Sequence, residues 1–352
     1  MHYRLFRRFI TILIVLLLLT TYVCADSIDF TDPDIIKEKA NEVLDGLSPQ
    51  RLIDAVTSGL TSFTRQLAAY LGICMAVIII ASVLSVLTER NGSQNSFELI
   101  GICLIVLMLF SPLTKCFSLV QEHIEAVSGF MVSFVPTGAM LHVASGNTLS
   151  AALMSSALPS SITALQLICV SLILPITKAC LSISAVNSIC SNPALEGLYS
   201  SLKGIALWIC GLAFTVFTGI LSLQTILQAS ADNIAMKGLR YGAAKLIPVA
   251  GGLISESMKT VISGMKYIKN IAGISGILFI LYTLIIPICY ICSIKLYLTI
   301  LIHTAKICEQ GKIKGFLEGV QGIINILLAL VLVSGVSFII VLAMFTATNV
   351  SI

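Results

Sequence analysis

Long runs of apolar residues without charge alternate along the chain with short polar segments. The runs that match a membrane-crossing helix in length, or come close to it, are Gln66–Thr88, Leu99–Thr114, Ser161–Thr177, Gly204–Ala231, Asn270–Ile294 and the end of the chain within Gly319–Ile352. Because about 20 apolar residues cross the hydrocarbon core of a bilayer, the pattern predicts an all-α polytopic membrane protein with about 6–8 transmembrane helices. A further apolar segment, Ala179–Leu195, either crosses or does not, and this decides the orientation of everything after it.

The composition agrees with a membrane protein. Of the 352 residues, 57% are hydrophobic and 11% are charged, whereas soluble domains carry roughly 25% charged residues. The net charge is only +4, aromatic residues make up 7%, and no long basic run occurs. The composition therefore excludes an ordinary soluble domain and gives no sign of nucleic-acid binding.

The first 25 residues have the pattern of a secretory signal peptide. Three arginines (Arg4, Arg7 and Arg8) precede the apolar Phe9–Leu19, and Val23-Cys24-Ala25 is an acceptable cleavage site. The alternative is an uncleaved anchor, and in both cases the chain from Asp26 onward is delivered outside the cytoplasm. We therefore divide the chain into a signal peptide (1–25), an extracytoplasmic amphipathic segment (26–65) and a multi-span membrane domain (66–352).

The extracytoplasmic segment is acidic and amphipathic. It holds eight acidic and four basic residues, a net charge of 4 − 8 = −4. Asp32-Pro33 and Ser48-Pro49 each predict the start of a short amphipathic helix, because proline is favoured at the first helical position. Such helices either dock on a partner or on the membrane surface, or pack on the protein's own spans.

Two proline-containing places interrupt the apolar pattern, and they supply the candidate functional residues. Proline lacks an amide donor and glycine weakens a helix, and irregular backbone at membrane depth survives only where protein or water satisfies it. We therefore expect two proline-broken or re-entrant segments that line a passage or contact a partner. The alternatives are an ordinary surface loop with a short amphipathic helix and, for the histidine, a hydrogen-bonded helix interface. The residues are Pro136, Gly138 and His142 at the first place, and Pro248, Gly251, Gly252, Ser255, Glu256, Ser257 and Lys259, within Lys245–Asn270, at the second.

An internal repeat relates these places. A shift of 112 residues aligns Pro136 with Pro248 and Pro175 with Pro287, and in both copies the two prolines are 39 residues apart. This predicts two related units, 99–178 and 211–290, and paired helix breaks in two halves of a membrane protein point to a site at their interface. Chance similarity between apolar segments is the alternative.

The distribution of charge indicates how the two repeat units are oriented relative to each other in the membrane. Residues 232–270 carry six basic and two acidic side chains, a net charge of +4, which favours the cytoplasm. With Asp26 outside, this placement requires Ala179–Leu195 to cross the membrane, and the repeat units are then inverted. The sequence thus favours an inverted repeat.

No catalytic constellation is present. The chain contains no H-E-x-x-H, no G-x-S-x-G and no nucleotide-binding glycine loop. Glu122-His123-x-Glu125 has the pattern of a solvated helix face, and Cys289-x-x-Cys292 lies inside a predicted span. We therefore expect a non-enzymatic protein without a cofactor or a metal.

The order of elements resembles one known family. A signal peptide, a short acidic segment, a run of spans and the late sequence KLIPVAGGLISESMKTVISG (Lys245–Gly264) are similar to the stage III sporulation protein AE family of endospore-forming bacteria, with Ile247–Gly252 and Ser255–Ser257 as the most specific part. The resemblance implies a multi-pass protein of the mother-cell membrane that surrounds the forespore. It also implies partners: other stage III A proteins, including an ATPase and ring-forming subunits, and stage II protein Q across the envelope.

Three functional hypotheses follow. The first is a non-enzymatic membrane subunit of the channel or secretion-like apparatus that the resemblance implies, which supports forespore development and late forespore gene expression. The second is a secondary transporter for a small solute, which suits paired broken helices. The third is a membrane enzyme such as an intramembrane protease, which lacks the paired Asp or Ser/His residues that its chemistry requires.

Overall fold

Helices make up all the regular secondary structure in the part of the chain that the structure describes. The computed structural model describes residues 49–88, 94–144, 148–246 and 251–347. The predicted signal peptide, the first predicted amphipathic helix and Pro248 lie outside these residues. The elements are α3 (Pro49–Thr88), α4 (Gln94–Ala144), α5 (Thr148–Leu167), the π-helical turn η2 (Ile168–Ile173), α6 (Leu174–Cys190), α7 (Pro193–Leu246), α8 (Gly251–Ile307) and α9 (Gly311–Ala347).

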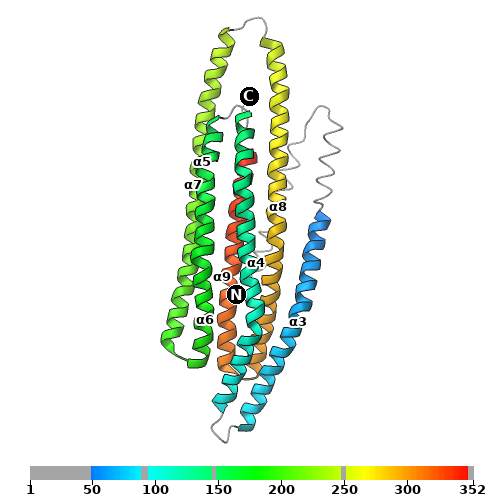
Figure 1. Cartoon of the computed structure of the whole chain (residues 1–352), viewed down its shortest axis with the longest axis vertical. Coiled ribbons are helices and arrows are strands. Elements are labelled where there is room, and N and C mark those ends of the chain that lie inside the picture. The colour runs from blue at the N-terminus through cyan, green and yellow to red at the C-terminus, as the bar shows by residue number, and fades with distance from the viewer. Residues whose placement is uncertain (1–48, 89–93, 145–147, 247–250, 348–352) are drawn as a thin grey trace. The chain divides into compact units, whose positions relative to one another are not determined.

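Six of these helical stretches are long and apolar enough to cross a membrane (Figure 1). They are Leu67–Ser85, Glu98–Val143, Met154–Cys190, Pro193–Gln224, Asn270–Ile307 and Gly311–Thr346. This confirms the predicted all-α polytopic fold. Most of the helices are longer than the bilayer requires, since the 54 residues of α7 extend about 80 Å.

The described turns between helices are short. At the end of α6, Ser191 takes a left-handed conformation with φ of 50°, and its amide donates to the carbonyl of Asn187 at 2.7 Å. The Asn192 side chain then accepts the Ala194 amide at 3.0 Å, which caps α7 ahead of Pro193 at its first position. Glu309 makes the corresponding left-handed turn between α8 and α9, with φ of 54°. Because the turns are tight, consecutive helices run antiparallel.

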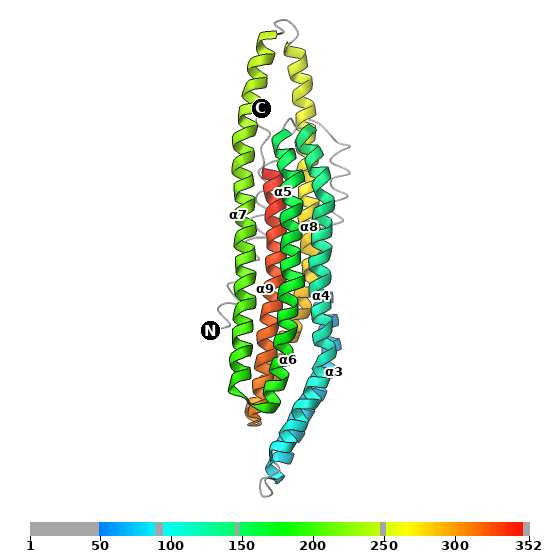
Figure 2. The ribbon, with the colours of Figure 1, turned by 60° about the vertical axis from the view of Figure 1, so that its left-hand side comes forward.

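The last helix, α9, lies in the middle of the bundle. It packs against α4, α6, α7 and α8, and the red α9 runs between these helices in Figures 1 and 2. Its large side chains, such as Ile323, Leu327 and Phe338, are buried. Between helices in a membrane, close packing supplies the attraction and small residues permit it. Gly319, Gly322 and Gly335 of α9 accordingly meet Ser184, Lys203 and Leu284 of three neighbouring helices.

The predicted helix break at Pro136 is wrong. The helix α4 is continuous from Gln94 to Ala144, with both Pro112 and Pro136 inside it. A proline costs one backbone hydrogen bond, here at the carbonyl of Val132, but a long helix held by neighbours tolerates this loss. Val135 and Ala139 on either side of Pro136 are buried in the bundle and hold the helix in place.

The segment Ala179–Leu195 does not form a separate crossing. Residues up to Cys190 continue the helical stretch that begins at Thr148, and the chain turns at Ser191 and Asn192. Six crossings then leave the start of α3 on the same side of the membrane as the end of α7 and the start of α8. The expectations that the chain before the first span lies outside and that the connection after α7 lies in the cytoplasm are therefore incompatible with this fold.

The inverted repeat is also wrong. In the 112-residue alignment, α4 corresponds to α7, and α5 with α6 corresponds to α8. Figure 1 shows α4 and α7 running in the same direction, as two intervening antiparallel turns require. The two units are thus parallel helical hairpins. Their connections also differ: Pro136 lies within a helix, whereas α7 ends at Leu246 and α8 begins at Gly251.

Candidate functional site

A buried histidine in the middle of α4 is the most distinctive polar group in the described bundle. His123 is only 4% exposed, and its ring faces the backbone of Thr283 on α8. Pro287 lies four residues after Thr283 within α8, so it supplies no amide to the Thr283 carbonyl. Neither ring nitrogen of His123 has a hydrogen-bond partner among the described residues. The imidazole is nevertheless the group placed to compensate the carbonyl that proline leaves open.

The prediction that His123 lies on a solvated face is wrong. The structure exposes Glu122 and Glu125 and buries His123 between them. The helical periodicity of α4 could have placed His123 on the buried face. Intervals of four and three residues relate the buried positions Cys116, Val120, His123 and Val127. The four-residue spacing between Thr283 and Pro287 is also visible in the sequence. Its position beside His123, however, follows only from the packing of α4 against α8.

Other buried polar side chains lie in the same apolar stretches. Ser128 on α4, Gln224 on α7 and Ser337 on α9 are each less than a tenth exposed and have at least one polar atom without a hydrogen bond among the described residues. Uncompensated polar groups are costly at membrane depth. The described residues contain no cluster of histidine, cysteine and carboxylate side chains that could hold a metal.

The residues of the first predicted site lie on two faces of α4, one buried and one exposed. Gly138 and His142 are buried, and His142 packs edge-on against Phe345 of α9 at 5.3 Å between ring centres. Gly138 lies against Met154 of α5 and the same Phe345. Pro136 instead lies on the exposed side of α4. Gly138 and His142 thus join three helices, whereas Pro136 faces outward.

The second predicted site belongs to the beginning of α8. Gly251, Gly252, Ser255, Glu256, Ser257 and Lys259 all lie in α8, which continues without interruption to Ile307. The segment Lys245–Asn270 is therefore not a re-entrant element where the structure describes it. The contact between Gly273 and Thr346 places these residues beyond the end of α9, away from Pro136 and His142.

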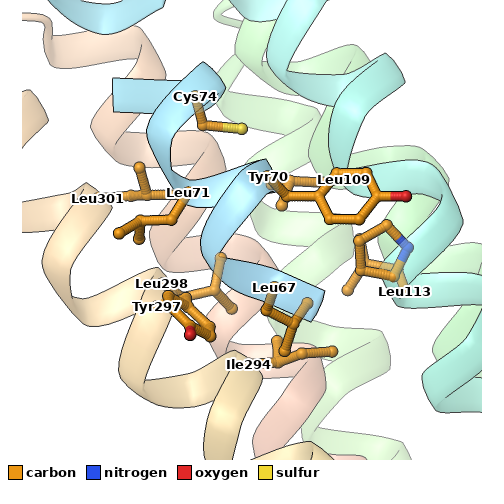
Figure 3. Close-up of a pocket in the computed structure, with 11 residues that line it drawn as sticks. Leu67, Tyr70, Leu71, Cys74, Leu109, Leu113, Ile294, Tyr297, Leu298 and Leu301 are labelled. Carbon is orange, nitrogen blue, oxygen red and sulfur yellow. The ribbon is translucent and has the colours of Figure 1, made fainter. Parts of the chain in front are cut away.

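A small apolar cavity lies between α3, α4 and α8 (Figure 3). It has a volume of about 20 Å³ and is lined largely by leucines, together with Tyr70, Cys74 and Tyr297. Such a volume admits one water at most, and an apolar lining keeps it dry. It is too small for a solute.

The geometry defines a class of protein: a multi-pass helical membrane bundle with a filled centre and isolated buried polar groups. The family model of stage III sporulation protein AE matches residues 35–349. The chain belongs to this family, as its resemblance had implied.

A curated relative agrees with this assignment. The chain is 23% identical over 245 residues to stage III sporulation protein AE of Bacillus subtilis (strain 168), across 68% of this chain and 61% of the relative. The match thus spans less than two thirds of that protein's length. No solved structure matched the chain.

Proposed function

We propose that this protein is an integral membrane subunit of a channel or secretion-like apparatus between mother cell and forespore. The match of the family model over residues 35–349 carries the proposal. In it, the chain resides in the mother-cell membrane around the forespore and supports forespore development and late forespore gene expression. Its partners are other stage III A proteins, including an ATPase and ring-forming subunits, and stage II protein Q.

The packing of the bundle favours a role in assembly over conduction through a single chain. The helix α9 fills the centre with buried apolar side chains, and the cavity beside α3 encloses only about 20 Å³. A passage for any solute larger than water would thus run between chains rather than through one bundle. The chain would act without catalysis or a cofactor, and energy would come from the partner ATPase.

Deletion of the gene tests this proposal. We expect development to stop after engulfment, with normal vegetative growth, and complementation by the intact gene to restore spores. A growth or solute-uptake defect in vegetative cells would count against the proposal.

The alternative, secondary transport of a small solute, has one observation in its favour. His123 is an ionisable group buried at membrane depth beside a helix that contains Pro287, and such groups mark proton pathways in transporters. Solute uptake by the purified protein alone in liposomes would support this alternative, and its absence would favour the assembly role.

A further inference from the structure

The turn between α8 and α9 is held by side chains from two other helices. The end of α3 and the beginning of α4 lie beside this turn and extend beyond it (Figures 1 and 2). Ser82 Oγ of α3 donates to the Cys308 carbonyl at 3.1 Å. On the other side of the turn, the Lys312 amide donates to Glu98 Oε1 of α4 at 2.8 Å. Helices α3 and α4 thus bind free backbone groups at both ends of the turn.

The local sequence does not favour this turn. At the end of α8, the Gln310 amide donates to the Ala305 carbonyl and the Glu309 amide to the Lys306 carbonyl, which is the pattern of a Schellman motif. The left-handed position of this motif is usually glycine, but here it is Glu309, with φ of 54°. A side chain makes that conformation unfavourable. The nearest glycine, Gly311, already belongs to α9, so contacts from outside the turn must help to hold it.

The beginning of α9 is also capped from outside. Gln310 is at the N-cap position, because its carbonyl accepts the Lys314 amide. Its side chain does not cap the helix: it is buried, and its Nε2 donates to Ser85 Oγ of α3 at 3.3 Å. Glu98 of α4 takes this place and accepts the amide of Lys312, the second residue of α9. A carboxylate at a helix N-terminus is further favoured by the helix dipole.

Close apolar packing surrounds these polar contacts. A Cβ atom on Gly101 of α4, three residues after Glu98, would lie 3.2 Å from Ala81 Cβ of α3 and 3.3 Å from Ile313 Cδ1 of α9. Ile313 is fully buried. Three helices therefore meet here without spare room, and a shift of one requires the others to shift.

We propose that these contacts form a latch that joins the α3 and α4 ends to the central helix α9, so that a displacement of those ends is transmitted to α9. The latch consists of Ser82, Ser85, Glu98 and Gln310 with the backbone of Cys308 and Lys312. Because α9 packs against α4, α6, α7 and α8, a displacement passed to α9 reaches most of the bundle. The proposal does not depend on the proposed function.

Hydrogen–deuterium exchange of the full-length protein in detergent tests the latch. Mass spectrometry follows exchange in peptides that cover 311–320, at the start of α9, and 79–88, at the end of α3. In Glu98→Ala we expect exchange about fivefold faster in both peptides, since the loss of a helix cap changes a local opening equilibrium by about this factor. Faster exchange confined to 311–320 would indicate an ordinary cap and overturn the proposal, as would unchanged exchange in both peptides.

Two matched variants separate the latch from a general effect of charge. Glu98→Gln keeps an oxygen acceptor in place, so we expect exchange within about twofold of the parent. Glu318→Ala removes an exposed carboxylate of α9 whose partner is Lys314 of the same helix, at 3.5 Å, and should leave the peptide 79–88 unchanged. Equal effects of Glu98→Ala and Glu318→Ala on that peptide would contradict the latch.

The coupling should also act in the opposite direction, because coupling between two sites is reciprocal. Ser82→Ala removes the hydrogen bond from α3 to the Cys308 carbonyl and changes no residue of α9. We expect exchange in 311–320 about threefold faster, the effect of one neutral hydrogen bond. This milder variant keeps the test decisive if Glu98→Ala fails to fold. Parent-like exchange of 311–320 in Ser82→Ala would overturn the proposal.

Discussion

At the scale of single residues, the pairing of His123 with a proline-opened carbonyl is the least expected feature. A buried imidazole in an apolar layer is costly unless it has a partner. The Thr283 carbonyl is equally costly without a donor, because Pro287 removes the amide that would normally bind it. Because the imidazole faces this carbonyl, we expect each group to reduce the cost of the other, so the two positions should be energetically coupled.

This coupling leads to a testable prediction. His123→Ala should destabilise the purified protein in detergent by about 1–3 kcal/mol, because it leaves the Thr283 carbonyl uncompensated. In a Pro287→Ala background the amide of residue 287 donates to the Thr283 carbonyl. His123→Ala should then lower the free energy of unfolding by less than it does in the parent, and the difference is a coupling energy of about 0.5–3 kcal/mol. Unfolding curves of the four proteins measure the coupling.

The matched control is His303→Ala on the exposed side of α8, which should change stability by less than about 0.5 kcal/mol. An unchanged cost of His123→Ala in the Pro287→Ala background would show that the histidine does not serve the carbonyl.

The sequence revealed some of these residues and concealed others. Prolines and glycines are visible in any sequence, so Pro136 and Pro248 were predicted to break helices. Whether a proline breaks a helix depends on the packing of its neighbours. Pro136 lies in a continuous helix because the buried Val135 and Ala139 hold it there. His123 was missed for the opposite reason, since two adjacent glutamates suggested a polar face although its periodic position was buried.

At the scale of elements, α9 organises the packing. The sequence predicted it as a span, but not that it would be surrounded by four other helices. Its glycines explain the arrangement, since Gly319, Gly322 and Gly335 contact neighbouring helices while Gly311 and Gly315 meet open space. The regular spacing of Gly311, Gly315 and Gly319 therefore does not mark one continuous contact face.

Substitution at these glycines tests the packing. A Cβ atom on Gly335 would lie 2.7 Å from Leu284 Cδ1, whereas nothing lies within 4 Å of one on Gly315. Gly335→Ile should therefore destabilise the bundle by about 1–3 kcal/mol through overpacking. Gly315→Ile should be nearly neutral. Thermal unfolding in detergent compares the two variants, and equal losses would contradict the central placement of α9.

At the scale of the whole molecule, the number of crossings governs orientation. The apolar runs are visible in the sequence, but two neighbouring runs have the same composition whether they form one long helix or two short ones. Here the stretch Thr148–Cys190 contains two predicted segments in one crossing, with the π-helical η2 between α5 and α6. This single difference changes an inverted repeat into a parallel one.

Six crossings make a prediction that does not depend on which side is cytoplasmic. Reporters inserted at Asn192 and at Glu309, in the two described turns, should lie on the same side, because two crossings separate them. A reporter fused after Ile352 should lie on the opposite side, one crossing beyond Glu309. Paired alkaline phosphatase and fluorescent-protein fusions report the two sides, since each is active in only one compartment. If the Asn192 and Glu309 reporters lay on opposite sides, Ala179–Leu195 would have to cross on its own, and the parallel repeat would be lost.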